Sequence, residues 1–259
     1  MSTLMFLAVL PVILILMFIY NKDREKEPIS LLMKLFCLGI LSCFLVLIVS
    51  SIMEIFFPFL SKSLEEQNFI ETILYAFFGV ALVEEFCKWI MLYRCGYNHK
   101  EFDEAYDIIV YSIFVSLGFA FFENIFYVVG TGSIATAILR SVLAIPGHAC
   151  DAIFMGYYLS MAKQFYYQND QVKEKRNIIL SVIVPTILHG IYDYCLMSGI
   201  TILIFAFLVF VIVLYIVSLR KIKEVSELNK KIKYKNNFCS NCGRKVEGEF
   251  CPICGKRQE

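Results

Sequence analysis

The chain has 259 residues, of which 59% are hydrophobic and only 18% are charged, and its formal net charge is +1. A soluble domain is nearer half apolar and a quarter charged, so this composition excludes an ordinary soluble protein and indicates a polytopic membrane protein. The ten cysteines do not form a disulfide pattern, because six are scattered through apolar segments and four lie in the last 21 residues. That spacing is typical of metal binding in a reducing compartment.

Apolar segments long enough to cross a membrane recur along the chain, since ~20 helical residues cover the hydrocarbon core. Such spans are predicted at 1–20, 31–57, 69–93, 105–129 and 134–161. The first has neither the basic start nor the small-residue cleavage site of a secretory signal, so we expect it to be retained.

The segment 177–219 is about twice as long as one crossing requires, so we expect a hairpin that turns at Ser198 and Gly199. A second turn that contains glycine is expected at 130–133. The sequence therefore predicts an all-α polytopic membrane protein with about seven transmembrane helices.

Lysine and arginine are concentrated in alternate loops. The loops after the first, third and fifth spans together hold nine basic residues, whereas the other loops hold only Lys62. Because basic loops remain in the cytosol, the N-terminus is predicted to lie outside and the C-terminus in the cytosol. The basic linker 220–236 follows the last span and is expected to lie on the anionic inner leaflet of the cell membrane.

Ionisable side chains lie well inside four successive spans, where one charge costs at least ~2.5–3.5 kcal/mol. Glu84 and Glu85 are adjacent, and one helical turn brings Lys88 to the same face, so that one lysine can approach both carboxylates. Two of the three histidines, His148 and His189, also lie inside spans. The other members are Glu123, Arg140, Asp151 and Asp193. Such groups are a functional-site hypothesis by default, and here they predict one polar cavity.

The residue types leave three functions open. A carboxylate that takes a proton from water, beside a histidine that stabilises an oxyanion, would hydrolyse a peptide bond. The same groups would bind zinc, although the chain has no His-Glu-x-x-His motif. An ion- or proton-coupled transporter and a non-catalytic membrane scaffold would also use them. A transporter usually shows two related halves, and the absence of a visible repeat favours a protease.

Two polar residues inside the spans, Asp151 and Arg140, can each be interpreted in two ways. Asp151 either orients His148 or closes a polar patch, and Arg140 either snorkels to the membrane surface or joins the site. Gly118 and Gly156 are expected to allow close packing between helices.

Four short motifs follow one another in successive spans. They are Glu84-Glu85-x-x-Lys88, Phe122-Glu123-Asn124-x-x-Tyr127, Arg140…His148…Gly156 and His189-x-x-x-Asp193. Their succession over about 69–196 resembles the PrsW family of intramembrane proteases, which is related to the prenyl (CAAX) endopeptidases and bacteriocin-processing enzymes.

The resemblance implies a glutamic-type protease in which Glu84 or Glu85 activates water, and His148 and His189 complete the site. We favour Glu85 slightly as the base, because Glu84 has the better i,i+4 pairing with Lys88. The implied supporting residues are Lys88, Glu123, Asn124, Arg140, Asp151 and Asp193. The implied substrate is a membrane-associated protein, with anti-sigma factors as the family's example.

Two Cys-x-x-Cys-Gly turns lie at the end of the chain. Their four thiolates are predicted to hold one structural Zn²⁺, as in a small zinc ribbon. The predicted ligands are Cys239, Cys242, Cys251 and Cys254. This divides the chain into a transmembrane protease-like domain at 1–219, the linker 220–236 and a cytosolic ribbon at 237–259. The residues do not indicate the partner of the ribbon, and no stacking aromatic side chains support nucleic acid.

Overall fold

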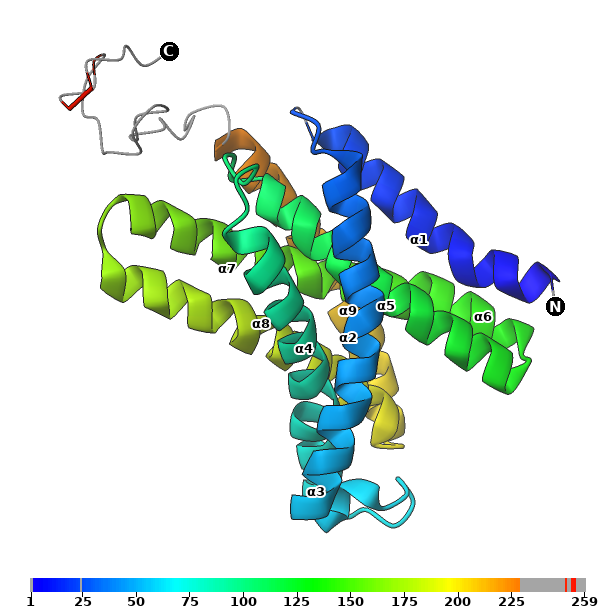
Figure 1. The fold of residues 1–259 in the computed structure, drawn as a ribbon. Helices are drawn as coiled ribbons and strands as arrows, with labels where there is room; N and C mark the ends of the chain where they lie inside the picture. Colours follow the sequence, from blue (N-terminus) through cyan, green and yellow to red (C-terminus); the bar gives the residue numbers. More distant parts are fainter. Residues whose placement is uncertain (1, 24, 229–249, 251–252, 255–259) are drawn as a thin grey trace.

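The computed structural model describes residues 2–23, 25–228, 250 and 253–254. Within 2–228 every regular element is a helix, as the composition predicts (Figure 1). The elements are α1 (Ser2–Lys22), α2 (Ile29–Phe56), η1 (Pro58–Ser61), α3 (Phe69–Leu74), η2 (Tyr75–Ala81), α4 (Leu82–Leu92), η3 (Tyr93–Tyr97), α5 (Asp107–Thr131), α6 (Ile134–Leu139), η4 (Arg140–Ala144), α7 (Ile145–Tyr167), α8 (Gln171–Met197) and α9 (Thr201–Leu228). Of the η elements, η1 is a 3₁₀ helix, and η2, η3 and η4 are π-helical.

Six helices among the described residues are long and apolar enough to cross a membrane: α1, α2, α5, the continuous α6–η4–α7, α8 and α9. The multi-pass membrane protein predicted from the sequence is thereby confirmed. The predicted third span is instead a succession of α3, η2, α4 and η3. It differs from the six because α4 carries three charged residues. Two π-helical turns interrupt it, as η4 interrupts α6–η4–α7.

The two turns expected from glycine are present. Gly132 ends α5 with φ of 59°, and Gly199 lies between α8 and α9 with φ of 67°. Both backbones are in the left-handed region, which glycine adopts at little cost. The apolar stretch 177–219 therefore forms the predicted hairpin.

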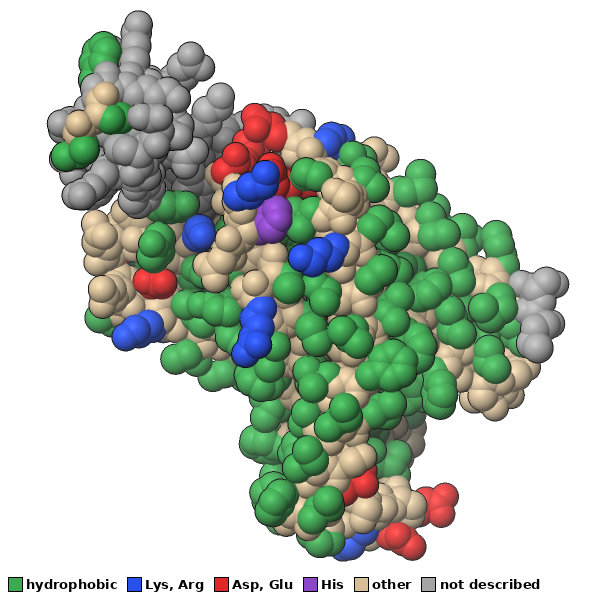
Figure 2. Space-filling model, in the orientation of Figure 1, with side chains coloured by type: hydrophobic (Ala, Val, Ile, Leu, Met, Phe, Trp, Pro, Cys, Tyr) green, Lys and Arg blue, Asp and Glu red, His purple; other side chains and the backbone are tan. Residues whose placement is uncertain are grey.

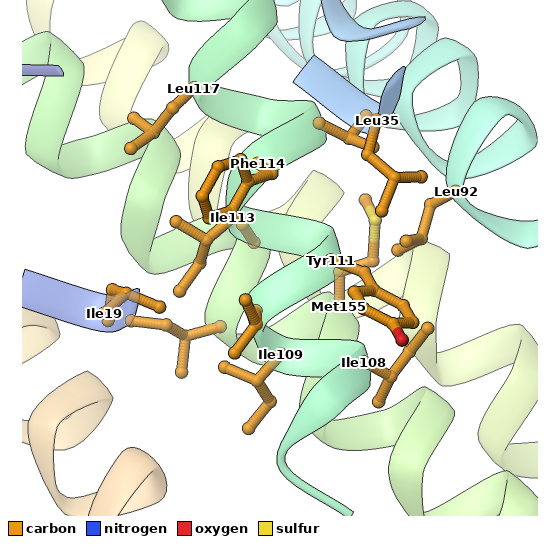
Figure 3. Close-up of a cluster of buried hydrophobic side chains, with 14 of the residues drawn as sticks. Ile19, Leu35, Leu92, Ile108, Ile109, Tyr111, Ile113, Phe114, Leu117 and Met155 are labelled. Carbon is orange, nitrogen blue, oxygen red and sulfur yellow. The ribbon is translucent and has the colours of Figure 1, made fainter. Parts of the chain in front are cut away.

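Helix α5 is the centre of the bundle. Every residue from Asp107 to Ala120 is buried, so this part of α5 is enclosed on all sides rather than on one face. Side chains of α1, α2, α4 and α7 pack against it, among them Ile19, Leu35, Leu92 and Met155 (Figure 3). Because α5 also carries Glu123 and Asn124, this packing fixes one wall of the polar cluster.

The outer surface of the helices is apolar. Large side chains of α1, α2 and α9 are exposed, including Phe6 at 61%, Leu47 at 63% and Phe205 at 63%. Figure 2 shows hydrophobic side chains over the middle of the molecule and most charged side chains toward its two ends. This distribution is the one that a lipid bilayer requires of a helical bundle.

Close helix contacts depend on glycine, as predicted for Gly118 and Gly156. A Cβ on Gly118 would lie 2.1 Å from the carbonyl oxygen of Phe36, and one on Gly156 would lie 2.8 Å from the Cα of Ile109. Both distances are far below van der Waals contact. Gly118 therefore lets α2 approach α5, and Gly156 lets α7 approach α5.

We expect Gly118→Ala to lower the midpoint of thermal unfolding in detergent, because the added methyl group would push α2 away from α5. Overpacking of this kind typically costs about 1–3 kcal/mol. Gly130→Ala is the matched control in the same helix, since nothing lies within 4 Å of a Cβ at that position. Equal midpoints for the two variants would contradict the proposed contact.

The three basic loops lie at one end of the bundle. The Tyr111 hydroxyl at the start of α5 donates to Glu27 in the loop after α1, with 2.5 Å between the oxygens. Lys163, near the end of α7, donates to the carbonyl oxygen of Tyr97 in η3 over 3.2 Å. These contacts agree with the alternation of loops used above. Which end faces the cytosol stays a prediction.

Glu27 is a buried carboxyl group outside the spanning helices and is only 6% exposed. Burial raises its pKa, the Tyr111 hydrogen bond opposes the rise, and the charges of Asp23 and Asp103 add to it, so that the pKa is about 7. The group therefore loses its proton near neutral pH in the folded protein.

We expect the stability of the protein to fall as the pH rises through about 7. Between the ordinary pKa of Glu27 in the unfolded chain and its raised pKa in the folded protein, the folded state binds more protons than the unfolded state. Glu27→Gln should reduce this dependence. The measurement is the unfolding midpoint of both proteins at about pH 5 and about pH 8. Identical pH dependence in the two proteins would show that Glu27 is not responsible.

The predicted zinc ribbon falls largely outside the described residues. Of its four predicted ligands only Cys254 is described. Cys239, Cys242 and Cys251, and the linker beyond Leu228, lie outside them. The ribbon therefore stays a prediction.

Candidate active site

The ionisable residues singled out in the sequence meet in one cluster inside the bundle. They come from α4 (Glu84, Glu85, Lys88), α5 (Glu123, with Asn124), η4 (Arg140), α7 (His148, Asp151) and α8 (His189, Asp193). Two π-helical turns border the cluster, because η2 ends just before α4 and η4 begins at Arg140. Such wide turns are frequent at functional sites.

Lys88 is the cation at the centre of the cluster, and its side chain is fully buried. Its Nζ lies 2.8 Å from Glu85 Oε1, 3.2 Å from Glu84 Oε2 and 3.2 Å from His148 Nδ1. One lysine thus contacts both carboxylates, as the spacing predicts. The sequence favours Glu85 as the base because Lys88 is expected to pair more closely with Glu84. In the structure the closer contact of Lys88 is with Glu85, which is the reverse of that expectation.

The ring of His148 is held at both nitrogens. Nδ1 faces Lys88, and Nε2 lies 3.1 Å from Glu123 Oε2. Because an ammonium group only donates, Nδ1 must accept, and the network assigns the ring proton to Nε2, which donates to the carboxylate. His148 is therefore fixed in one tautomer and one orientation.

His189 contacts the same oxygen of Glu85 as Lys88 does. Its Nδ1 is 2.9 Å from Glu85 Oε1, and its Nε2 is 3.4 Å from Asp193 Oδ2 and 3.9 Å from Glu84 Oε2. Asp151 Oδ2 lies 3.8 Å from Nδ1 of His189, so the structure pairs Asp151 with His189 and not with His148. The rings of the two histidines are 5.3 Å apart and face one another edge to face.

Arg140 points into the cluster and does not snorkel. Its Nη2 donates to Glu123 Oε2 over 2.7 Å, its Nε donates to Asn124 Oδ1 over 2.9 Å, and its guanidinium lies 4.1 Å above the ring of Tyr127. Arg140 thereby fixes the carboxylate that accepts the hydrogen bond from His148 Nε2.

A cavity of about 330 Å³ opens beside the cluster. One part of its wall is polar and includes Glu84, Glu123, His148, Asp151, His189 and Asp193. The other part is mostly apolar and includes Tyr127, Leu143, Leu188, Tyr192 and Leu214. Glu85, whose side chain is fully buried, lies behind this wall. Of the adjacent glutamates, Glu84 is thus the one that lines the cavity.

Sequence reasoning missed the apolar part of the wall, except for Tyr127 within one motif. A leucine has no distinguishing signal in a chain as apolar as this one. Tyr192 lies one position from Asp193, and its place next to a polar motif was the only available indication.

Four of the residues have the donor atoms of a metal site. Ligand atoms of Glu84, Glu85, His148 and His189 all lie within 4.8 Å of one another. Imidazole nitrogens and carboxylate oxygens are zinc ligands, so the donor types fit a divalent cation. Lys88, however, contacts three of the four, and a metal ion held by all of them would lie directly against its ammonium group.

The chain matches the family model described as PrsW family intramembrane metalloprotease over residues 27–218. A protein of Oceanobacillus iheyensis is 38% identical to it over 88% of this chain and 98% of that protein. Proteins of Geobacillus kaustophilus (37% identical over 76% of this chain and 81% of that protein) and Bacillus subtilis (33%, 85% and 94%) are also similar. All three are named Protease PrsW. No solved structure matches the chain.

Proposed function

The chain belongs to the PrsW family of intramembrane proteases, and from this premise we propose that it hydrolyses a peptide bond of a membrane-associated protein with water activated by Glu84. One observation carries the assignment of Glu84. It lines the cavity, whereas Glu85, the adjacent carboxylate, is enclosed between Lys88 and His189.

In the proposed reaction, a water molecule in the cavity gives a proton to the Glu84 carboxylate as its oxygen attacks the peptide carbonyl carbon. Negative charge develops on the carbonyl oxygen, and cavity-lining donors such as Arg140 and the histidines stabilise it. Glu84 then returns the proton to the departing amine, so that the products are a carboxylic acid and an amine and the enzyme is regenerated.

A metal ion bound to Glu84, Glu85, His148 and His189 would supply a second way to polarise the carbonyl and the water. We favour the metal-free reaction because Lys88 already places a positive charge against Glu84, Glu85 and His148. Two cations side by side in a low-dielectric interior would repel one another strongly.

Cleavage is accordingly expected to survive treatment with a zinc chelator. The test uses the full chain with Cys251→Ser and Cys254→Ser, so that the proposed structural zinc of the ribbon does not contribute. The measurements are the cleavage rate before and after chelation and the zinc bound per chain. Loss of cleavage together with about one bound zinc per chain would assign a metal to the membrane site.

As the substrate class we propose a protein anchored in the same membrane, with anti-sigma factors as the example suggested by the resemblance. The N-terminus is proposed to lie outside and the C-terminus in the cytosol, with the basic linker on the inner leaflet. The rival functions are a transporter and a scaffold, and both predict that no peptide bond is cut.

The experiment compares the membrane proteomes of cells that produce the native protein or the Glu84→Gln variant at equal levels. A truncated membrane protein that occurs only with the native protein would identify activity and substrate together. If both proteomes contain the same fragments, Glu84 is not the base. If these fragments also occur in cells that lack the protein, the protease proposal is wrong for this chain.

A further inference from the structure

Two backbone carbonyl groups of helix α1 contact Asn124 and Ser141, which lie beside the polar cluster. The amide Nδ2 of Asn124 donates to the carbonyl oxygen of Ala8 over 3.0 Å, and the hydroxyl of Ser141 lies 2.8 Å from the carbonyl oxygen of Leu7. Asn124 is completely buried. These two bonds join α1 to α5 and η4 at the level of Arg140.

Pro11 explains why a carbonyl group of α1 is available there. Proline has no backbone N–H, so the carbonyl of Leu7, four residues earlier, loses its partner within the helix. A carbonyl without a partner inside the bundle is costly. The Ser141 hydroxyl lies within reach of this one and shares its proton between Leu7, at 2.8 Å, and the carbonyl oxygen of Ala137 in its own helix, at 2.6 Å. Ala8 is fully buried beside Val128 and Ala137, and its small side chain permits the close approach.

Asn124 can take only one orientation between its two partners. The Ala8 carbonyl only accepts, so the NH₂ group of Asn124 must face it. The Nε–H of Arg140 only donates, so Oδ1 must face Arg140. The α1 carbonyl therefore keeps the acceptor of Asn124 directed at Arg140.

A continuous set of contacts leads from α1 to His148. Asn124 holds Arg140, Arg140 holds Glu123 over 2.7 Å, and Glu123 lies 3.1 Å from His148 Nε2. We propose that Asn124 is a positioning residue for His148 and that α1, through the carbonyl of Ala8, is part of the apparatus that sets the orientation of this histidine. The consequence for turnover rests on the proposed protease function, whereas the effect on His148 does not.

The test reads His148 directly and needs no substrate. Diethyl pyrocarbonate modifies unprotonated imidazole nitrogens that are free to react, and mass spectrometry of the full-length protein separates His148, His189 and His99. Both ring nitrogens of His148 are engaged in the native protein, so it should react slowly. His99, in the loop after η3, and His189 are the internal references.

Asn124→Leu removes both bonds of the amide with little change of volume. We expect the His148 rate to rise roughly tenfold, since a hydrogen bond to a charged group contributes at least that factor. The rates of His99 and His189 should stay the same. Ala8→Leu, which moves α1 away without altering Asn124, should produce the same change.

The double variant Ala8→Leu/Asn124→Leu should show no further increase, because both substitutions interrupt the same contact. Leu14→Ala is the matched control on α1, since Leu14 is 56% exposed, and it should leave all three rates unchanged. An unchanged His148 rate in Asn124→Leu would overturn the proposal. So would a parallel rise at His148 and His189, which would indicate a general loss of structure.

Once a substrate is known, Asn124→Leu should lower kcat with little change in KM, because His148 acts on charge that develops in the transition state. A faster His148 reaction in a protein that cleaves nothing in its native form would leave the positioning role intact and reject only the protease function.

Discussion

Glu84→Gln is expected to abolish cleavage while leaving the amount of protein in the membrane nearly unchanged. Glutamine keeps the shape of the side chain but cannot take a proton from water, and a general base contributes about 10²–10⁴ in rate. The fold should tolerate the change, because Lys88 retains its closer contact with Glu85 at 2.8 Å.

Glu85→Gln should behave differently. Glu85 is fully buried and contacts both Lys88 and His189, so the substitution leaves Lys88 without its closest carboxylate. We expect mainly a lower protein level, since removal of one partner of a buried ion pair typically costs about 3–5 kcal/mol.

The two variants are compared by cleavage per molecule of enzyme reconstituted with its membrane substrate, beside immunodetection of the protein in cells. Glu54→Gln is the control, because Glu54 is an exposed glutamate in a spanning helix. If Glu85→Gln abolished cleavage at a normal protein level and Glu84→Gln did not, the roles of the two glutamates would be exchanged.

Much of the fold followed from the sequence because the bilayer restricts it so strongly. Apolar length located the spanning helices, and the Gly199 turn divided the long segment 177–219 into α8 and α9. The π-helical turns η2 and η4 could not be predicted in this way, because a one-residue change in hydrogen bonding leaves composition and length unaltered. The sequence therefore predicts a single spanning helix at 69–93, whereas α3, η2, α4 and η3 form this segment in the structure.

The members of the polar cluster were predictable, but their pairing was not. An ionisable residue inside a span is conspicuous, and all those selected meet around Lys88 or beside it. Which oxygen faces which nitrogen depends on how four helices pack, and for this reason Asp151 was considered with His148 although it lies against His189. Pro11 and Ser141 were overlooked because each is ordinary in a membrane helix when considered alone.

The cluster contains five carboxyl groups. Among the described residues that meet there, only two side chains other than histidine carry a positive charge, Lys88 and Arg140. Lys88 is the only one of the two that contacts both Glu84 and Glu85. The arrangement therefore depends on this lysine more than on any other single group. Its removal is the most severe test of the fold.

Lys88→Met is expected to reduce the protein in the membrane to a small fraction of its native level. Methionine fills a similar volume but leaves Glu84 and Glu85 buried without a compensating charge, at a cost of about 3–5 kcal/mol, which is a large part of the 5–15 kcal/mol that typically stabilises a domain. Lys88→Arg keeps the charge and should retain more protein. Lys34→Met is the matched control, because Lys34 is an exposed lysine within α2.

The double variant Glu85→Gln/Lys88→Met should recover part of the level, since it removes one carboxylate together with the lysine, but it should not recover cleavage. A normal level of Lys88→Met would contradict this account. It would mean that protons bound to the carboxylates or histidines, rather than the ammonium group of Lys88, balance the charge inside the bundle.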